Sequence, residues 1–127
     1  MPTFPSTEWA DAVVESLDND PQFQRIANYF DATVLFEFGD DSYVFRLRDG
    51  AVRACHDGAR FVEWDIAVRA PVETWERFLS ASPPPFYNDL RSVWMQHDLT
   101  IEGDLTTALQ QWRSLKYLID VFGEVQR

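Results

Sequence analysis

The chain has 127 residues, of which 46% are hydrophobic and 15% are aromatic, and this composition excludes an intrinsically disordered protein. Its formal charge of −10, from 21 acidic against 11 basic residues, disfavours binding to nucleic acids or to anionic membrane surfaces. The length is typical of one domain, and we expect a single domain over residues 1–127.

The N-terminal sequence and the lack of a long apolar run predict a cytoplasmic protein. Residues 1–9 lack the basic start and apolar centre of a signal peptide. No apolar run approaches the ~20 residues that a membrane-spanning helix needs. Cys55 is the only cysteine, which excludes an internal disulfide and a cysteine-based metal cluster. We expect no metal and no cofactor.

Two short helices are predicted at the start of the chain. In the first, Trp9, Val13 and Leu17 recur every four residues, as they do on one face of a helix. Asp20 and Pro21 then have the residue types preferred at an N-cap and at the first helical position of a second helix. The apolar residues of this second helix are Phe23, Ile26, Ala27 and Phe30.

From residue 32 the apolar period shortens to two, which predicts β-strands. Strands at 32–38, 42–48 and 51–55 are separated by short turns and form an antiparallel meander. A fourth strand is predicted over 61–69, with Trp64 and Ile66 on its apolar face. We interpret the charged residues of both signs on the opposite faces as a solvated surface with cross-strand ion pairs. They are Glu37, Arg46, Arg48, Arg53, Glu63 and Asp65.

The second half of the chain predicts three helices and one strand. A helix over 71–82 ends before three consecutive prolines, and a short helix follows at 87–95. The segment Leu99–Asp104 is a short strand that leads into a long helix from Leu105 to about Phe122. Gly103 at the end of this strand allows a sharp turn, and Asp104 supplies the N-cap of the helix. The pattern as a whole indicates an α+β domain with an antiparallel sheet and its helices on one face.

The order of these elements and the motif L-x-I-x-G-[DN] resemble the sterol carrier protein-2 (SCP2) family. Leu99, Ile101, Gly103 and Asp104 match that motif, and the likeness extends from Glu8 to Phe122. The resemblance implies a five-stranded, mainly antiparallel sheet whose edge is completed by the strand after the fourth helix. It also implies a hydrophobic tunnel between sheet and helices that accommodates sterols, fatty acids or acyl-CoA esters. Residues 83–87 and the aromatic helices depart from better-known members and would narrow or reshape the tunnel.

On this basis we predict a non-enzymatic domain that binds or carries an apolar small molecule, namely a fatty acid, an acyl chain or a sterol-like lipid. An empty cavity of ~300 Å³ would lower the free energy of unfolding by about 7 kcal/mol, at ~24 cal/mol per Å³. A tunnel therefore has to be filled by ligand or water, or it collapses. The predicted ligand-binding residues are Phe36, Phe38, Phe45, Trp64, Ile66, Phe78, Leu90, Trp94, Leu109 and Trp112.

Two other classes of function remain open from the sequence. The domain could be an accessory module with a filled core that docks to a partner enzyme, and self-association through the C-terminal helix into a homodimer is a further alternative. It could instead be a small enzyme that acts on an apolar substrate through His97, Asp98 or Glu102. We predict no catalytic residues, because the two histidines have no metal-ligand spacing and the sequence contains no nucleophile or phosphate-binding motif.

Overall fold

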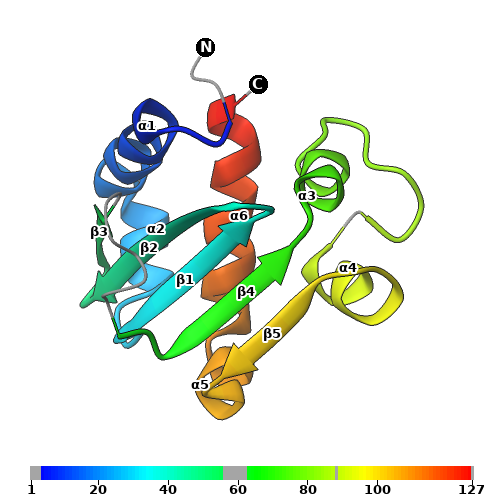
Figure 1. Ribbon diagram of the computed structural model, residues 1–127. Helices are drawn as coiled ribbons and strands as arrows, with labels where there is room; N and C mark the ends of the chain where they lie inside the picture. Colours follow the sequence, from blue (N-terminus) through cyan, green and yellow to red (C-terminus); the bar gives the residue numbers. More distant parts are fainter. Residues whose placement is uncertain (1–3, 56–62, 88, 127) are drawn as a thin grey trace.

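The computed structural model describes residues 4–55, 63–87 and 89–126, which form one five-stranded sheet with helices packed against it (Figure 1). The strands are β1 Ala32–Phe38, β2 Asp41–Arg48, β3 Ala51–Cys55, β4 Ile66–Ala70 and β5 Thr100–Gly103. The helices are α1 Thr7–Asp18, α2 Pro21–Ile26, α3 Val72–Phe78, α4 Leu90–Gln96, α5 Leu105–Gln110 and α6 Trp112–Gln126. None of these helices is long and apolar enough to cross a membrane.

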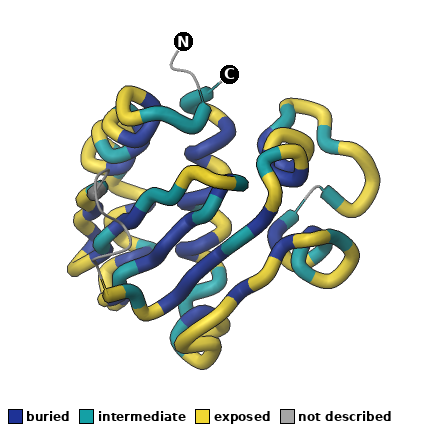
Figure 2. The backbone as a smooth tube through the Cα atoms, viewed as in Figure 1, coloured by how far each residue is buried: buried dark blue, intermediate teal, exposed yellow. Residues whose placement is uncertain are grey.

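The sheet has the strand order β3-β2-β1-β4-β5. β1 pairs antiparallel with β2 and parallel with β4, while β2 with β3 and β4 with β5 are antiparallel pairs. The prediction of a mainly antiparallel five-stranded sheet is therefore confirmed, including the position of β5 at an edge. Buried residues from every helix join those of the inner sheet face in one hydrophobic cluster, as the buried segments of β1, β4 and α6 illustrate (Figure 2).

Aromatic rings fill the space between the sheet and the helices. Phe122 of α6 lies 4.8 Å from Phe36 and 4.9 Å from Trp9 between ring centroids, both in edge-to-face geometry. The indole N–H of Trp9 donates to the carbonyl oxygen of Phe122 over 3.2 Å, so this buried donor is satisfied. These contacts join α1, β1 and α6 in one aromatic cluster.

The predicted N-caps are confirmed, whereas several element boundaries are corrected. The side chain of Asp20 accepts from the backbone N–H of Gln22, and that of Asp104 accepts from Thr107, at 3.0 Å each. Residues 71–82 and 87–95 form shorter helices than predicted, α3 and α4. Helix α3 ends four residues earlier, with Leu79 as its C-cap.

The predicted single helix from Leu105 to Phe122 is wrong, because the chain forms two helices that meet at Gln111. Gln111 caps α5, and α6 starts at the next residue and continues past Gly123, which is buried inside it. The break does not disturb the three-to-four spacing of the apolar residues, so periodicity alone gave no sign of it.

The fourth strand is shorter than predicted, since β4 begins at Ile66 and residues 61–62 lie outside the described ranges. The backbone N–H of Asp65 donates to the Thr33 carbonyl over 2.8 Å, but Asp65 precedes the ladder. Because the pleat does not extend to Trp64, its ring packs on the outer sheet face with Val44 and Ala67. The prediction that Trp64 shares the inner apolar face with Ile66 is wrong.

Gly103 generates a prediction about stability. A Cβ at Gly103, where φ is +94°, would lie 2.2 Å from the Asp65 carbonyl oxygen, whereas a Cβ at Gly39, where φ is +66°, meets nothing closer than 3.5 Å. We expect Gly39→Ala to cost about 1–2 kcal/mol through backbone strain and Gly103→Ala to cost more than about 3 kcal/mol, because the backbone at Asp65 must also move. Urea unfolding of both variants measures the difference, and equal costs would contradict the clash.

A second prediction concerns pH. The Tyr117 hydroxyl donates to the Asp20 carboxylate, which raises the pKa of Tyr117 to about 12 and lowers that of Asp20. Since the unfolded tyrosine titrates near 10, the bond contributes stability below pH ~10 that is lost as the pH rises through about 12. It also contributes stability above pH 3.8 that is lost as the pH falls through the depressed pKa of Asp20.

Urea unfolding at a series of pH values should show a smaller loss of stability between pH ~10 and ~12 in Tyr117→Phe than in the unmodified chain. Tyr29→Phe is the control, because Tyr29 is 88% exposed. If both variants lose stability as the unmodified chain does over this range, the Tyr117–Asp20 bond does not contribute.

Candidate functional site

The residues predicted to line a tunnel form a buried group and a surface group in the structure, and Trp64 belongs to neither. Phe36, Phe38 and Phe45 are at most 1% exposed, and their rings contact Trp9, Trp75 or Phe122 within the aromatic cluster. Trp64 lies on the outer face of the sheet. The other predicted residues within the core, each at most 8% exposed, are Ile66, Phe78 and Leu90.

The second group meets at the surface. Trp94, Leu109 and Trp112 line a cleft of about 340 Å³ together with Arg91 and Met95. The two indole rings lie 5.7 Å apart between centroids, and Met95 and Leu109 are 66% and 58% exposed. We call these five residues the apolar cleft.

The apolar cleft exists because two short helices expose part of their apolar surface. In α4, Leu90 and Val93 enter the core, which leaves Trp94 half-buried and Met95 exposed. In α5 only Ala108 is buried. Single exposed apolar residues are common on proteins, whereas a concave group of them is a candidate binding surface.

Sequence reasoning did not identify Arg91 and Met95 as members of this site. Neither has a signal of its own, because an arginine and a methionine on a short amphipathic helix are ordinary residues. Their significance comes only from the packing of α4 beside the α5–α6 joint.

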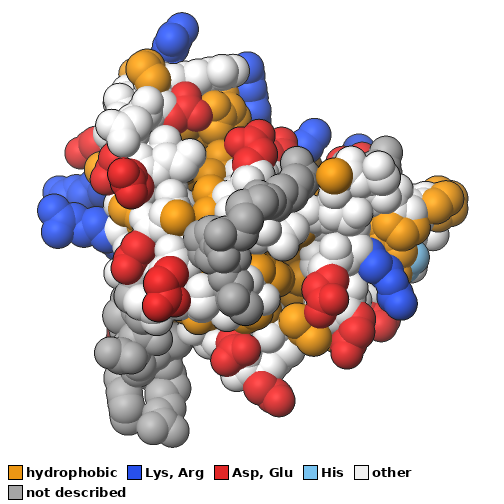
Figure 3. All heavy atoms as spheres, turned by 90° about the horizontal axis from the view of Figure 1, so that it is seen from above, with side chains coloured by type: hydrophobic (Ala, Val, Ile, Leu, Met, Phe, Trp, Pro, Cys, Tyr) orange, Lys and Arg blue, Asp and Glu red, His pale blue; other side chains and the backbone are white. Residues whose placement is uncertain are grey.

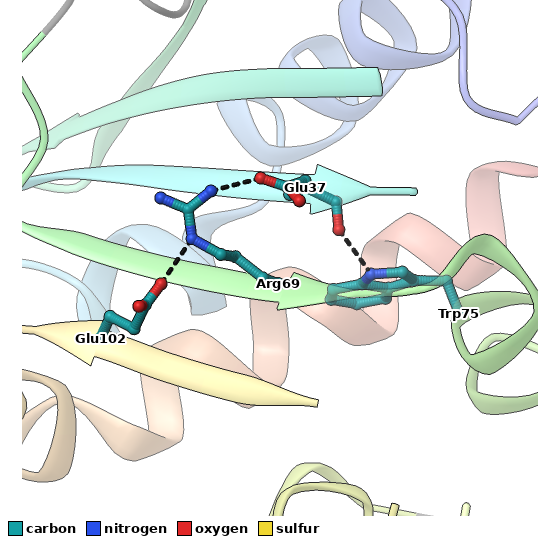
Figure 4. Close-up of polar contacts among 4 residues, drawn as sticks. All are labelled: Glu37, Arg69, Trp75 and Glu102. Atoms are coloured by element: carbon teal, nitrogen blue, oxygen red, sulfur yellow. Dashed lines mark hydrogen bonds and ion pairs between the residues drawn. The ribbon is translucent and has the colours of Figure 1, made fainter. Parts of the chain in front are cut away.

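A separate polar cluster occupies the outer face of the sheet (Figure 4). Arg69 of β4 forms an ion pair with Glu37 of β1 and a second with Glu102 of β5, the latter at 2.5 Å. The indole N–H of Trp75 donates to the backbone carbonyl of Glu37 over 2.9 Å. Burial alone would lower the pKa of Arg69, but the bonds to both carboxylates raise it overall and keep the guanidinium charged.

This polar cluster joins three strands by cross-strand ion pairs, but among the described residues Glu37 is the only member of the predicted charged set that takes part in them. With Asp98 and Thr100, Arg69 also lines a pocket of about 360 Å³. Glu102 is held by Arg69, while the His97 ring stacks on Tyr87 at 3.6 Å between centroids. Among the described residues no group of three or more His, Cys, Asp or Glu side chains is arranged to hold a metal.

Figure 3 shows acidic side chains spread over the molecular face seen from above, with hydrophobic side chains between them. They do not gather there into one strongly charged patch. The candidate site is defined by the apolar side chains that line the cleft.

No family model matches the chain, and no curated protein matches it. Several solved structures do. A crystal structure of sterol carrier protein 2 has a TM-score of 0.76 and 17% identity, covering 96% of this chain and 98% of that one. A conserved hypothetical protein from Thermus thermophilus, described as possibly a sterol carrier protein, has a TM-score of 0.70 and 20% identity, with coverages of 98% and 90%.

A third similar structure is the UbiJ-SCP2 ubiquinone synthesis protein, with a TM-score of 0.61, 15% identity and coverages of 96% and 95%. The protein thus belongs to the class of α+β domains with a five-stranded mixed sheet. More particularly, its fold is SCP2-like, as the Leu99–Asp104 motif had indicated.

The polar cluster provides a further prediction. Glu37 and Glu102 lie on β1 and β5, the two strands that flank β4. Replacing Arg69 by Gln leaves both carboxylates without their shared cation. We expect the free energy of unfolding to fall by about 1–2 kcal/mol, because the Arg69 side chain is only 32% exposed and two ion pairs are broken. Arg46→Gln is the control, since Arg46 pairs with Asp31 where both side chains are more exposed, and should cost less than about 1 kcal/mol. Equal losses in urea unfolding would show that the cluster adds nothing beyond a surface pair.

Proposed function

We propose that this domain binds a fatty acid or a similar apolar small molecule at the apolar cleft, without transforming it. The observation that carries the proposal is the meeting of two indole rings with the exposed side chains of Met95 and Leu109 in one concave surface. The SCP2-like fold supports the proposal, because one of the similar structures is sterol carrier protein 2.

The energetics favour the cleft over the core as the binding place. Full burial of a leucine or methionine contributes ~1.5–3 kcal/mol, so covering Met95 and Leu109, each more than half exposed, contributes about 2–4 kcal/mol. Opening a ~300 Å³ space among the packed rings of the aromatic cluster would instead cost about 7 kcal/mol before any ligand contact is made. Binding at the cleft avoids this cost.

Arg91 favours an anionic end group on the ligand. It lines the cleft from α4, and no ion pair joins it to another residue in the described part of the chain. A guanidinium binds a carboxylate through two parallel hydrogen bonds. With apolar side chains on the other walls, this arrangement suits a fatty acid better than a neutral sterol.

The test measures binding of a long-chain fatty acid and of the corresponding alcohol by isothermal titration calorimetry. Leu109→Gln should weaken both by at least about tenfold, because a polar group replaces an apolar wall. Arg91→Gln should weaken binding of the fatty acid but not binding of the alcohol. Tyr29→Gln, which changes an exposed residue that does not line the cleft, should change neither.

Unchanged binding in Leu109→Gln would exclude the cleft. In that case the volume-reducing variant Phe36→Leu tests the core: altered affinity would place the ligand among the aromatic rings, as in the tunnel that the sequence analysis predicted.

A second candidate function is an accessory domain that docks to a partner enzyme. The aromatic cluster, in which rings of β1 contact rings of α1, α3 and α6, supports this alternative, as does the similarity to a ubiquinone synthesis protein. The exposed Leu105 and Leu109 would then contact protein, either an enzyme or a second copy of the chain. Native mass spectrometry separates these cases, because a bound lipid adds a small-molecule mass and a second copy doubles the mass.

A small enzyme is the third alternative, and His97→Ala tests it. Unchanged turnover of any candidate substrate by this variant would remove His97 from consideration.

A further inference from the structure

A further cavity lies between α2 and the α5–α6 joint, and it differs from the apolar cleft in chemistry. Its volume is about 660 Å³, nearly twice the 340 Å³ of the cleft. Both volumes are within the range of ~300–1,000 Å³ that is typical of small-molecule sites. We call it the polar pocket, and its lining residues are Gln22, Arg25, Ile26, Gln110, Gln111, Arg113 and Ser114.

The polar pocket carries positive charge in a strongly acidic protein. The chain has a net charge of −10, yet the lining contains Arg25 and Arg113 and no aspartate or glutamate. Within the described ranges, no ion pair engages either arginine. The first turn of α6 supplies Arg113 and Ser114, so the dipole of this helix adds to the positive potential of the two guanidinium groups.

The walls of the polar pocket are held in place at both ends of α2. At the start of α2, the Tyr117 hydroxyl donates to the Asp20 carboxylate. At its end, the hydroxyl of Ser114, which is 1% exposed, donates to the Ile26 carbonyl over 3.3 Å. A cavity whose walls are already fixed loses little conformational entropy when a ligand enters.

The residue types in the lining narrow the class of ligand. Three glutamine amides and two guanidinium groups offer many N–H donors, while Ile26 is the only apolar member and no aromatic ring is present on which a base could stack. A phosphate monoester carries a charge of about −1.5 to −2 at pH 7, which two arginines neutralise, and its oxygens accept several hydrogen bonds. We propose that the polar pocket binds the phosphate group of a small molecule or of a lipid headgroup.

In the experiment, inorganic phosphate, pyrophosphate and a sugar phosphate are each titrated into the full chain without added fatty acid. Binding is measured from the changes in the backbone amide NMR chemical shifts. Phosphatidic acid in phosphatidylcholine vesicles, followed by co-sedimentation, forms the lipid arm. We expect shifts at residues 110–114 and, for the double variant Arg25→Gln/Arg113→Gln, at least about tenfold weaker binding in whichever arm shows binding. Binding in the soluble arm identifies a metabolite phosphate, and binding only to vesicles identifies a headgroup.

Arg48→Gln/Arg53→Gln is the matched control, because it removes the same two charges from exposed positions on β2 and β3. An equal loss of affinity in this control would reduce the effect to net charge and overturn the proposal. Absence of binding to every probe would also overturn it. Fatty-acid binding to the apolar cleft is measured separately through Leu109→Gln, so either proposal can fail without the other.

Discussion

The contact between the Phe122 ring and the rings on β1 and α1 is the constraint on which the rest of the structure depends. Because Phe122 lies within 5 Å of both Trp9 and Phe36, at 4.9 and 4.8 Å, helix α6 sits directly on the sheet. The tunnel that the sequence led us to expect would lie between this helix and the sheet. The aromatic rings occupy that position here, and apolar surface remains available where α4 and α5 are incompletely buried.

The sequence predicted those features of the fold that local chemistry determines. The N-caps Asp20 and Asp104 were identified because their side chains satisfy free amides a few residues away. Three features depend on distant contacts and were missed: the break at Gln111, the outward position of Trp64 and the double ion pair of Arg69. None of them changes the spacing of apolar residues, which was the signal used.

The candidate site was predicted only in part, for a physical reason. Sequence periodicity identifies the apolar face of each helix but not whether another element covers that face. Trp94, Leu109 and Trp112 were named as ligand contacts together with Phe36 and Phe45, since all five carry the same apolar signal. Only the tertiary arrangement separates them, because it buries the phenylalanines and leaves the other three at the surface cleft.

The break at Gln111 places two different surfaces on one short segment. Leu109 and Trp112 belong to the apolar cleft, while Gln110 and Arg113 belong to the polar pocket. Both surfaces therefore depend on the placement of the same stretch of backbone, residues 109–113. If both surfaces bind ligands as proposed, linkage requires any effect of one ligand on the affinity for the other to be matched by an equal effect in return. A segment that the sequence suggested was an uninterrupted helix thus presents two surfaces of opposite chemistry from a few consecutive residues.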